Sequence, residues 1–254
     1  MTGLTREPVV SPDGTTLATY VLGETPDGRP WADLLEPHTP DLALVAQELL
    51  LSRPGWLVSA GEVVGTLLLD AGAQRIRHAH AYTLDLTSAL PPALTAAAPP
   101  PGSMVRQFGS DPILLADALA PALSSAYRPG HPDYGRDVND LVRLLAGRGL
   151  GAVLPVSRIA FDTDGTALGA CLVTSREGSP PHGGPWVADL FRSRGPEWAG
   201  LGATLLAYSV RAAAVAGLPG IGLVVSEGNP ARRVYERLGF TSVASSLTVQ
   251  LPMR

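Results

Sequence analysis

Residues 186–240 constrain the fold of this chain more than any other stretch, because two strand patterns and two helix patterns flank a glycine turn. In order, the segments are an apolar strand at 186–192, a glycine turn at 197–202, a helix at 203–216, an apolar strand at 221–225 and a short helix at 229–240. Gly217 and Gly239 end the two helices. The stretch therefore predicts a strand–helix–strand–helix unit.

The glycine turn has the composition of an anion-binding loop. Gly200 and Gly202 let the backbone approach a ligand closely, and the start of the next helix offers unpaired N–H groups and the positive end of the helix dipole. A bare connection is the alternative, because glycine makes up 28 of the 254 residues and two glycines at this spacing often arise by chance. The position of the turn between a strand and a long helix favours phosphate binding.

Together with the residues downstream, this turn resembles the GCN5-related N-acetyltransferase (GNAT) family. The resemblance rests on the turn and on Asn229 followed by the run Tyr235-Glu-Arg-Leu-Gly-Phe240. The phosphate turn of the family follows the pattern Q/R-x-x-G-x-G/A, which this chain matches at both glycines. Glu197 departs from the first position and puts a negative charge near the pyrophosphate, which Arg192 and Arg194 could offset.

The resemblance covers about residues 103–254 and implies an α+β (α/β) fold with a mixed, mostly antiparallel central sheet flanked by helices. It implies an acetyl-CoA-dependent N-acetyltransferase that transfers the acyl group directly to the amine of a small-molecule or peptide acceptor. Coenzyme A would pair with the main chain of Leu190, Phe191 and Arg192. The turn amides that would bind the pyrophosphate belong to Ala199, Gly200, Leu201, Gly202, Ala203 and Thr204. Asn229 would approach the thiol end of the cofactor and Arg232 the nucleotide end.

Two residues are candidates for proton transfer. Tyr235 stands where the family commonly places a tyrosine that protonates the departing thiolate, and a phenol with an ordinary pKa of about 10 suits that role. The alternative is an aromatic side chain that packs the last helix on the sheet, since the spacing from Asn229 is one residue shorter than in the commonest form of the motif. Asp189 is the candidate base, against the alternative that it faces solvent or caps a loop.

A non-enzymatic function is the alternative for the whole chain. Glu197 favours a catalytically inactive scaffold of the same fold that binds acyl-CoA or a partner, whereas Asn229 and Tyr235 favour the enzyme.

Composition divides the chain into three parts. Residues 1–88 predict a small α/β domain, with strands at 15–22, 56–58 and 74–86 and a helix at 42–51. Ser59 and Glu62 have the spacing of a capping box for a second helix that ends at Asp70. Residues 89–102 are too rich in proline and alanine for a packed element and predict a linker, and residues 103–254 form the GNAT-like domain.

The first half of that third part predicts two helices and a hairpin. Asp111 and Pro112 begin a helix that runs to about Tyr127, and a second helix follows at 138–145. The family admits its acceptor at the loop between these helices. Asp162 to Gly165 have the chemistry of a hairpin turn, and 242–251 predict one or two closing strands.

Charge and composition argue against several partners. The net charge is −4 and every basic residue is an arginine, without the basic stripe of a nucleic-acid binder. No apolar run reaches the roughly 20 residues of a membrane span, and the first residues lack a signal-peptide pattern. These features favour a cytoplasmic protein without membrane or nucleic-acid partners, and they leave a homodimer open.

Cysteine and histidine give little support for a metal site. Cys171 is the single cysteine, which excludes an internal disulfide, suits a reducing compartment and predicts a small buried side chain. His78 and His80 share one face of a strand, but no third ligand is evident, so a packed or surface pair is favoured and no metal is expected.

Overall fold

The computed structural model describes residues 5–25, 28–108, 112–131, 138–148, 151–176 and 183–253. The chain divides into two compact units: unit 1 comprises residues 1–80 and 244–254, and unit 2 comprises residues 81–243. The expected linker at 89–102 lies inside unit 2, so it does not coincide with this division. Within the described ranges, no helix is both long enough and apolar enough to cross a bilayer.

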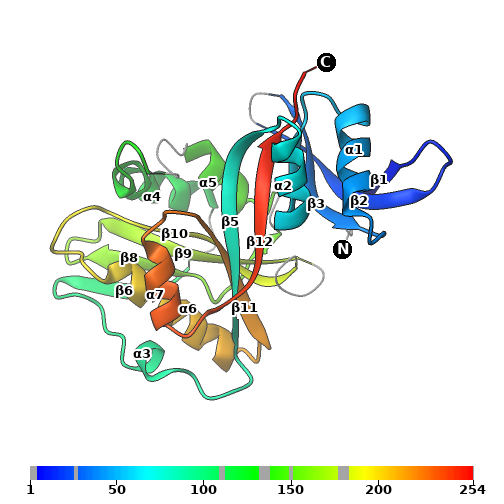
Figure 1. Ribbon diagram of the computed structural model, residues 1–254. Coiled ribbons are helices and arrows are strands. Elements are labelled where there is room, and N and C mark those ends of the chain that lie inside the picture. The colour runs from blue at the N-terminus through cyan, green and yellow to red at the C-terminus, as the bar shows by residue number, and fades with distance from the viewer. Residues whose placement is uncertain are drawn as a thin grey trace. The chain divides into compact units, whose positions relative to one another are not determined.

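Unit 1 is a sheet with two helices (Figure 1). Its elements are β1 (Arg6–Val10), β2 (Thr16–Glu24), β3 (Pro30–Pro37), α1 (Leu42–Ser52), β4 (Leu57–Gly61), α2 (Glu62–Asp70), the first part of β5 (Gln74–Asp85) and most of β12 (Thr241–Gln250). The strand order is β1-β2-β3-β4-β12-β5. Strands β1 to β3 are antiparallel, β3 and β4 are parallel, and β12 is antiparallel to β4. The sequence predicted neither β1 nor β3, whereas the other elements match predicted segments.

One apolar core holds unit 1 together. Leu247 and Val249 of β12 are buried while Ser246 and Thr248 are only half-buried, which is the period of two expected for a strand with one covered face. These two side chains pack in a cluster with Val58 of β4 and with Val45, Leu49, Val64 and Leu68 of the two helices. The last strand of the chain is therefore a core element of unit 1.

The two helices of unit 1 begin in different ways. The carboxylate of Asp41 accepts a hydrogen bond from the Leu44 amide at 3.0 Å, which caps α1. The capping box expected at Ser59 is wrong, because β4 continues to Gly61 and Ser59 lies within that strand. The Ser59 hydroxyl instead lies 2.8 Å from that of Thr248 and accepts a hydrogen bond from the Trp31 indole.

Unit 2 contains the remaining elements. They are the end of β5, α3 (Pro92–Thr95), β6 (Ser103–Gln107), α4 (Pro112–Ala126), α5 (Val138–Leu145), β7 (Ala152–Val153), β8 (Arg158–Asp162), β9 (Ala167–Arg176), β10 (Gly184–Arg192), α6 (Leu201–Val215), β11 (Gly220–Ser226), α7 (Ala231–Arg237) and the start of β12. The strand order is β5-β11-β10-β9-β8-β6, with β7 also paired to β9. The predicted hairpin is confirmed as β8 and β9, and the two predicted helices are α4 and α5. Asp111 lies outside the described residues.

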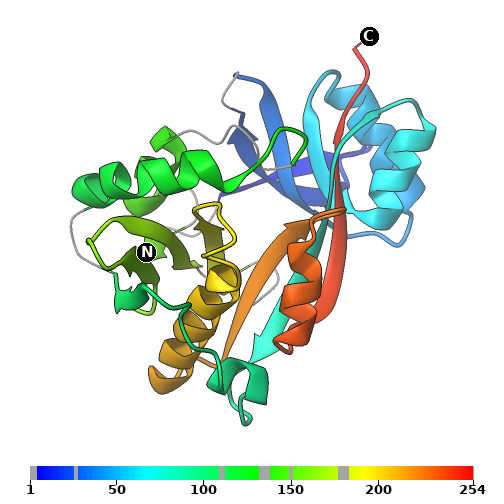
Figure 2. The same ribbon diagram turned by 90° about the vertical axis from the view of Figure 1, so that its left-hand side faces the viewer.

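Helices cover both faces of the unit 2 sheet (Figure 2). Helices α4 and α5 pack on one face, where Leu119 and Leu141 share a cluster with Leu172 and Phe191 of the sheet. Helices α6 and α7 pack on the other face, where Leu205 and Tyr235 share a cluster with sheet residues such as Leu223. The mixed, mostly antiparallel sheet with flanking helices agrees with the predicted fold class.

The segment at 89–102 packs onto unit 2 and does not behave as a free linker. Leu94 of α3 is fully buried in the cluster with α6. The hydroxyl of Thr204 donates to the carbonyl of Ala98 at 3.0 Å, and the guanidinium of Arg211 donates to that of Thr95 at 3.1 Å. The expectation of an unpacked segment is therefore corrected. Although the segment is rich in proline, the burial of Leu94 holds it against α6.

Both units repeat one arrangement of elements, which the sequence reading missed. The series β1-β2-β3-α1-β4-α2-β5 in unit 1 corresponds to β8-β9-β10-α6-β11-α7-β12, which begins in unit 2. In each, three antiparallel strands are followed by a helix and a strand parallel to the third. The parallel pairing begins at a Pro-Trp pair in both, since Trp31 lies opposite Leu57 and Trp186 opposite Gly222.

The first hairpins of the two series also share a sequence. Asp13-Gly-Thr-Thr-Leu17 in one corresponds to Asp164-Gly-Thr-Ala-Leu168 in the other. Gly14 and Gly165 adopt φ angles of 88° and 85°, and each donates its amide to the residue three positions earlier. The same backbone turn therefore uses nearly the same residues, and this match at four of five positions is the signal that could have revealed the repeat.

Candidate active site

Strands β10 and β11 pair for only a short distance and then leave an edge of β10 open. Their paired residues are Trp186 with Gly222 and Val187 with Leu223. A shift in register between Val187 and Asp189 follows on the β9 side of β10, which marks a β-bulge. Beyond it, β10 continues to pair with β9 as far as Arg192. Main-chain groups on the β11 side of this last part are therefore available for another strand-like partner.

The alternation of the strand decides which residues face that open edge. The Ser193 amide donates to the Leu168 carbonyl at 2.6 Å, so Ser193 and Phe191 direct their main-chain groups toward β9. Leu190 and Arg192 consequently direct theirs to the open edge. The Tyr127 hydroxyl reaches the Leu190 carbonyl at 3.4 Å from the end of α4. Phe191 instead contributes its side chain, which is buried in the cluster with α4 and α5.

The glycine turn ends in a helix start that no side chain caps. Gly200 is the residue before α6 and has a left-handed backbone, with φ 85° and ψ −15°. The amides of Ala199 and Leu201 donate to carbonyls inside the turn, and the Thr204 amide donates to the Gly200 carbonyl. These bonds shape the turn and occupy three of the six amides that were candidates for phosphate binding.

The other three amides belong to Gly200, Gly202 and Ala203, and within the described part of the chain none has a backbone acceptor. A Cβ atom at Gly200 or Gly202 would meet no atom within 4 Å, so the space beside both glycines is open. Open space, uncapped amides and the positive end of a fifteen-residue helix are together suited to an anion.

Glu197 lies beside this site in a folded position. Its carboxylate occupies the place that a Cβ at Gly195 would take, so it rests against the backbone of that glycine. The guanidinium of Arg192 donates to the carbonyls of Ser193 and Gly195, at 2.7 Å and 3.4 Å. The turn therefore carries both the unfavourable carboxylate and the positive charge that could offset it.

A cleft of about 720 Å³ lies next to the turn. Its lining comes from the end of α4 and the chain after it, and from the segment that follows β10: Ala126, Arg128, His131, Arg192, Arg194, Gly195 and Pro196. The His131 ring stacks on Tyr127, with centroids 4.7 Å apart and planes 29° apart. Among the described residues, the cleft is thus lined by three arginines and one histidine and by no carboxylate.

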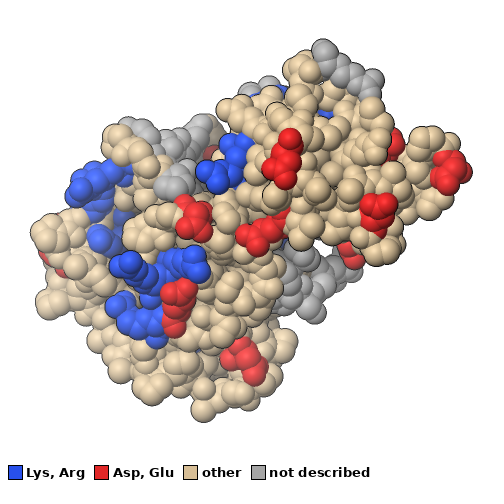
Figure 3. Space-filling model, viewed as in Figure 1, with Lys and Arg blue, Asp and Glu red and all other residues tan. Residues whose placement is uncertain are grey.

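The structure places the downstream candidates on α7 and just before it. The side-chain oxygen of Asn229 accepts the Ala231 amide at 2.9 Å, so Asn229 caps the start of that helix. Arg232 contacts two acids, Glu236 at 3.1 Å and Glu227 at 3.7 Å. Figure 3 shows basic side chains around an acidic one over α7.

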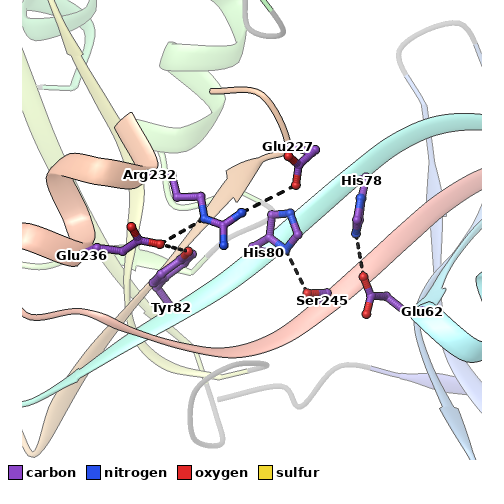
Figure 4. A network of polar contacts seen from close by, with 8 residues as sticks. All are labelled: Glu62, His78, His80, Tyr82, Glu227, Arg232, Glu236 and Ser245. Atoms are coloured by element: carbon purple, nitrogen blue, oxygen red, sulfur yellow. Dashed lines mark hydrogen bonds and ion pairs between the residues drawn. The ribbon is translucent and has the colours of Figure 1, made fainter. Parts of the chain in front are cut away.

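The same ion pair extends to Tyr82 of β5 (Figure 4). The Tyr82 hydroxyl donates to Glu236 at 2.9 Å. Hydrogen bonds from Tyr82 and Arg232 hold the pKa of Glu236 below its usual range, and burial raises the pKa of Tyr82. Arg232 is therefore engaged with acids of its own unit, in an arrangement that the sequence reading did not anticipate.

Tyr235 is buried, with 8% of its surface exposed, and its ring lies 6.3 Å from that of Phe240. Asp189 is also buried, at 5% exposure, which excludes the alternative that it faces solvent. Cys171 is a fully buried residue of β9, and burial raises the pKa of its thiol to about 12. The thiol is therefore protonated at neutral pH and unsuited to act as a nucleophile, as expected for a small core residue.

The two histidines of β5 have polar partners within unit 1. His78 lies 2.8 Å from the carboxylate of Glu62, and His80 lies 2.9 Å from the hydroxyl of Ser245 (Figure 4). Their rings are 4.5 Å apart. His80 is buried and His78 is half-buried, which agrees with a packed pair.

Comparison with solved structures identifies the fold. A GCN5-related N-acetyltransferase from Sphaerobacter thermophilus has a TM-score of 0.67 at 17% identity, covering 96% of this chain and 80% of the other. A tandem GNAT protein from the clavulanic acid biosynthesis pathway gives 0.61 at 19%, covering 94% and 80%. A GCN5-related N-acetyltransferase from Kribbella flavida gives 0.59 at 18%, covering 98% and 91%. No protein-family model and no curated protein matches the chain.

This chain has the GNAT fold. The likeness extends over both units, since the solved structures cover at least 94% of the chain. The resemblance found in the sequence stopped near residue 103, because unit 1 lacks the glycine turn that carries it. The repeated hairpin and Pro-Trp pair are the traces of the GNAT fold in that first part.

Within the GNAT fold, sequence reasoning missed the residues of the α4 side. Tyr127, Arg128 and His131 follow a helix and precede a stretch without regular pattern, so nothing in their spacing marks them. Only the packing of α4 across β9 and β10 brings them to the end of β10. That the loop after this helix admits the acceptor stays a prediction, and its residues 132–137 lie outside the described ranges.

Proposed function

We propose that this chain is an acetyl-CoA-dependent N-acetyltransferase that transfers the acetyl group directly to an amine. One observation carries the proposal: the open edge of β10 at Leu190 and Arg192 leads, within one turn, to the uncapped start of α6 at Gly200. The GNAT fold supports it. A strand edge suits the amide-bearing arm of coenzyme A, and a bare helix start suits its pyrophosphate.

The residues present fit this cofactor. Leu190 and Arg192 offer main-chain groups to the pantetheine arm, while Phe191 holds the strand against α4. Gly200, Gly202 and Ala203 offer amides to the pyrophosphate, and Ala199, Leu201 and Thr204 keep the turn in shape. The space beside the two glycines is open to a ligand, since a Cβ atom added at either glycine would meet no atom within 4 Å. Asn229 and Arg232 are proposed to contact the thiol and nucleotide ends.

When bound, acetyl-CoA supplies a thioester whose carbonyl carbon reacts with an amine. Asp189 is proposed to take a proton from the nitrogen of the acceptor amine, and the hydroxyl of Tyr235 to give a proton to the departing sulfur. The nitrogen–carbon bond forms as the carbon–sulfur bond breaks. Burial of Asp189 and Tyr235 keeps bulk water from the two proton transfers.

Calorimetric titration of acetyl-CoA, with coenzyme A as a control, tests the first half of the proposal. Micromolar binding is expected, together with release of free thiol from acetyl-CoA when a suitable amine is present. Tyr235→Phe should lower kcat at least about tenfold with an unchanged Kd for acetyl-CoA. Tyr208→Phe, a change on α6 beside Arg211, is the matched control and should leave both unchanged. Equal kcat in the two variants would remove Tyr235 from the mechanism.

A scaffold without catalysis is the second candidate, and one set of contacts favours it. Asn229 caps α7, Arg232 pairs with two acids and Tyr235 packs on Phe240, so each of these side chains already has a structural role. The same titration separates the two candidates. Binding without any thiol release over a broad amine panel would favour the scaffold, as would the absence of binding.

A further inference from the structure

The arginine-lined cleft beside β10 shares Arg192 with the proposed cofactor site, but its other lining residues are different. Gly200, Gly202 and Ala203 are not among the residues that line it. Three of its seven lining residues come from the α4 side, namely Ala126, Arg128 and His131. Helix α4 packs on the opposite face of the sheet from α6 (Figure 2). The cleft therefore reaches the face of the sheet that α4 covers, which is the face where the GNAT resemblance predicts the acceptor.

The charges of this cleft are unbalanced. Arg128 and Arg194 are exposed, and within the described residues the guanidinium group of neither forms a hydrogen bond or an ion pair. Arg192 is held in place by two carbonyls, which leave its positive charge uncompensated. One acid comes close, Glu197, whose carboxylate rests against Gly195 but does not line the cleft. A group of guanidinium side chains in a cleft is suited to carboxylate or phosphate oxygens.

The distance along β10 between Asp189 and the cleft sets the length of an acceptor that reaches both. Asp189, the proposed base, precedes Arg192 by three residues of extended strand. At about 3.3 Å per residue, the two are roughly 10 Å apart along the strand. An acceptor that places its amine at Asp189 and an anionic group in the cleft must span this distance. A free α-amino acid is too short, because its amine and carboxylate share one carbon.

We propose that the cleft binds the anionic group of an extended acceptor, and that the acceptor is a short peptide acetylated at its N-terminal amine and held by its C-terminal carboxylate. This inference rests on the proposed function and names its substrate class. At a span of about 3.5 Å per residue, a tripeptide places its two ends roughly 10 Å apart. Arg128 and Arg194 bind the carboxylate, and Arg192 connects the cleft to the strand edge.

Thiol release with alanine, dialanine, trialanine and tetraalanine, each as free acid and as C-terminal amide, tests this assignment. We expect trialanine to be the shortest good acceptor and to exceed its own amide in kcat/KM by about 10- to 100-fold, the range for losing a charged hydrogen-bond partner. The arginine variants Arg128→Gln and Arg194→Gln should remove most of this difference. Arg143→Gln, an exposed arginine of α5 outside the cleft, is the control with the same loss of charge and should keep it.

Two further readouts separate this inference from the proposed function. Thermal stabilisation of the protein by trialanine, compared with its amide and without acetyl-CoA, reports on the cleft alone. The Kd for acetyl-CoA should change by less than about threefold in Arg128→Gln, whose side chain has no proposed contact with the cofactor. Equal use of acids and amides, or an unchanged preference in both variants, would overturn the inference while leaving the acetyltransferase intact. An equal loss of acetyl-CoA affinity would assign the cleft to the phosphates of the cofactor instead.

Discussion

Helices α1 and α6 occupy the same place in the two repeated series, yet their starts are built in opposite ways. Each follows the third strand of its series and precedes the strand parallel to it. Helix α1 begins with Asp41, whose own carboxylate accepts the Leu44 amide. Helix α6 is preceded by Gly200, which has no side chain, and the amides of Gly202 and Ala203 have no backbone acceptor within the described residues. A side chain therefore caps the start of α1, whereas no side chain caps the start of α6.

The comparison shows that the fold alone does not make an anion site. An aspartate at a helix start fills the position that a phosphate would take, because both satisfy the same amides and the same dipole. Unit 1 therefore keeps the architecture of the GNAT fold, but the start of its α1 lacks the uncapped amides found at the start of α6. The two glycines at the start of α6 are the local difference that allows the proposed chemistry in unit 2.

The largest expected effect concerns the packing of unit 1. A Cβ atom at Gly65 of α2 would lie 2.6 Å from the Cβ of Leu247 in β12. Gly65→Leu should therefore push the last strand away and lower the free energy of unfolding by about 3 kcal/mol. Urea unfolding followed by tryptophan fluorescence measures the change. Val63→Leu, at a position of the same helix that is 61% exposed, should be nearly neutral.

A charge at the α6 start should sharpen the contrast with α1. Gly202→Glu places a carboxylate in the open space beside the bare amides, as Asp41 does in α1. The Kd for acetyl-CoA should rise at least about 30-fold, equivalent to about 2 kcal/mol. Gly202→Ala adds only a methyl group with no neighbour within 4 Å and should bind nearly as well. Calorimetry decides, and tight binding by the glutamate variant would contradict the proposed cradle.

Removal of the α1 cap should affect stability and leave the cofactor site alone. Asp41→Ala loses the hydrogen bond to the Leu44 amide, which should lower the free energy of unfolding by about 1 kcal/mol. Asp41→Asn keeps an acceptor oxygen and should restore most of it. Acetyl-CoA affinity should be the same in all three proteins. A weaker affinity in Asp41→Ala would show that α1 takes part in binding after all.

The smallest expected effect concerns two matched positions of β2 and β9. Counted from the repeated hairpin, Tyr20 in unit 1 corresponds to Cys171 in unit 2, and both are fully buried. Burial raises the pKa of Cys171 from 9.0 to about 12, so the unfolded chain loses the thiol proton first as pH rises. Stability should therefore fall between pH 9 and 12, by about 1 kcal/mol at pH 10.

The control for this pH effect is Cys171→Ala, which has no thiol to titrate. Its unfolding free energy should decline less steeply between pH 8 and pH 10 than that of the natural protein, when both are measured by urea unfolding. Parallel declines in the two proteins would assign the loss of stability to other groups. Tyr20, whose pKa burial also raises, remains in both proteins and cancels in the difference.

Sequence alone predicted the part of the fold that depends on local signals. The strand, glycine turn and helix around Gly200 were predicted because their signals are local. The backbone freedom of glycine, the helix dipole and the spacing of apolar residues all depend on positions only a few residues apart. The same reasoning failed at Ser59, where a capping pattern was overruled by strand pairing with residues almost 190 positions away. It failed at Leu94 for a similar reason, since burial against α6 is a long-range contact.

The candidate site was predictable to a similar extent. The turn and the open strand were readable, but the direction of each main-chain group was not, because it depends on the pairing of β10 with β9. Arg128 and His131 came to the site through the packing of α4. Local chemistry therefore predicted the place of the candidate site, and tertiary packing determined which residues surround it.

The place of β12 in unit 1 has a consequence for how the protein is made. Residues 1–80 cannot complete their core until residues 244–254 arrive. About 160 residues separate the two segments, so at usual rates of synthesis the first unit waits on the order of ten seconds on the ribosome. During that wait the edge of β4 that β12 later covers is unpaired, and such an edge is prone to pair with other chains. We therefore expect the nascent N-terminal unit to be the stage most exposed to wrong strand pairing.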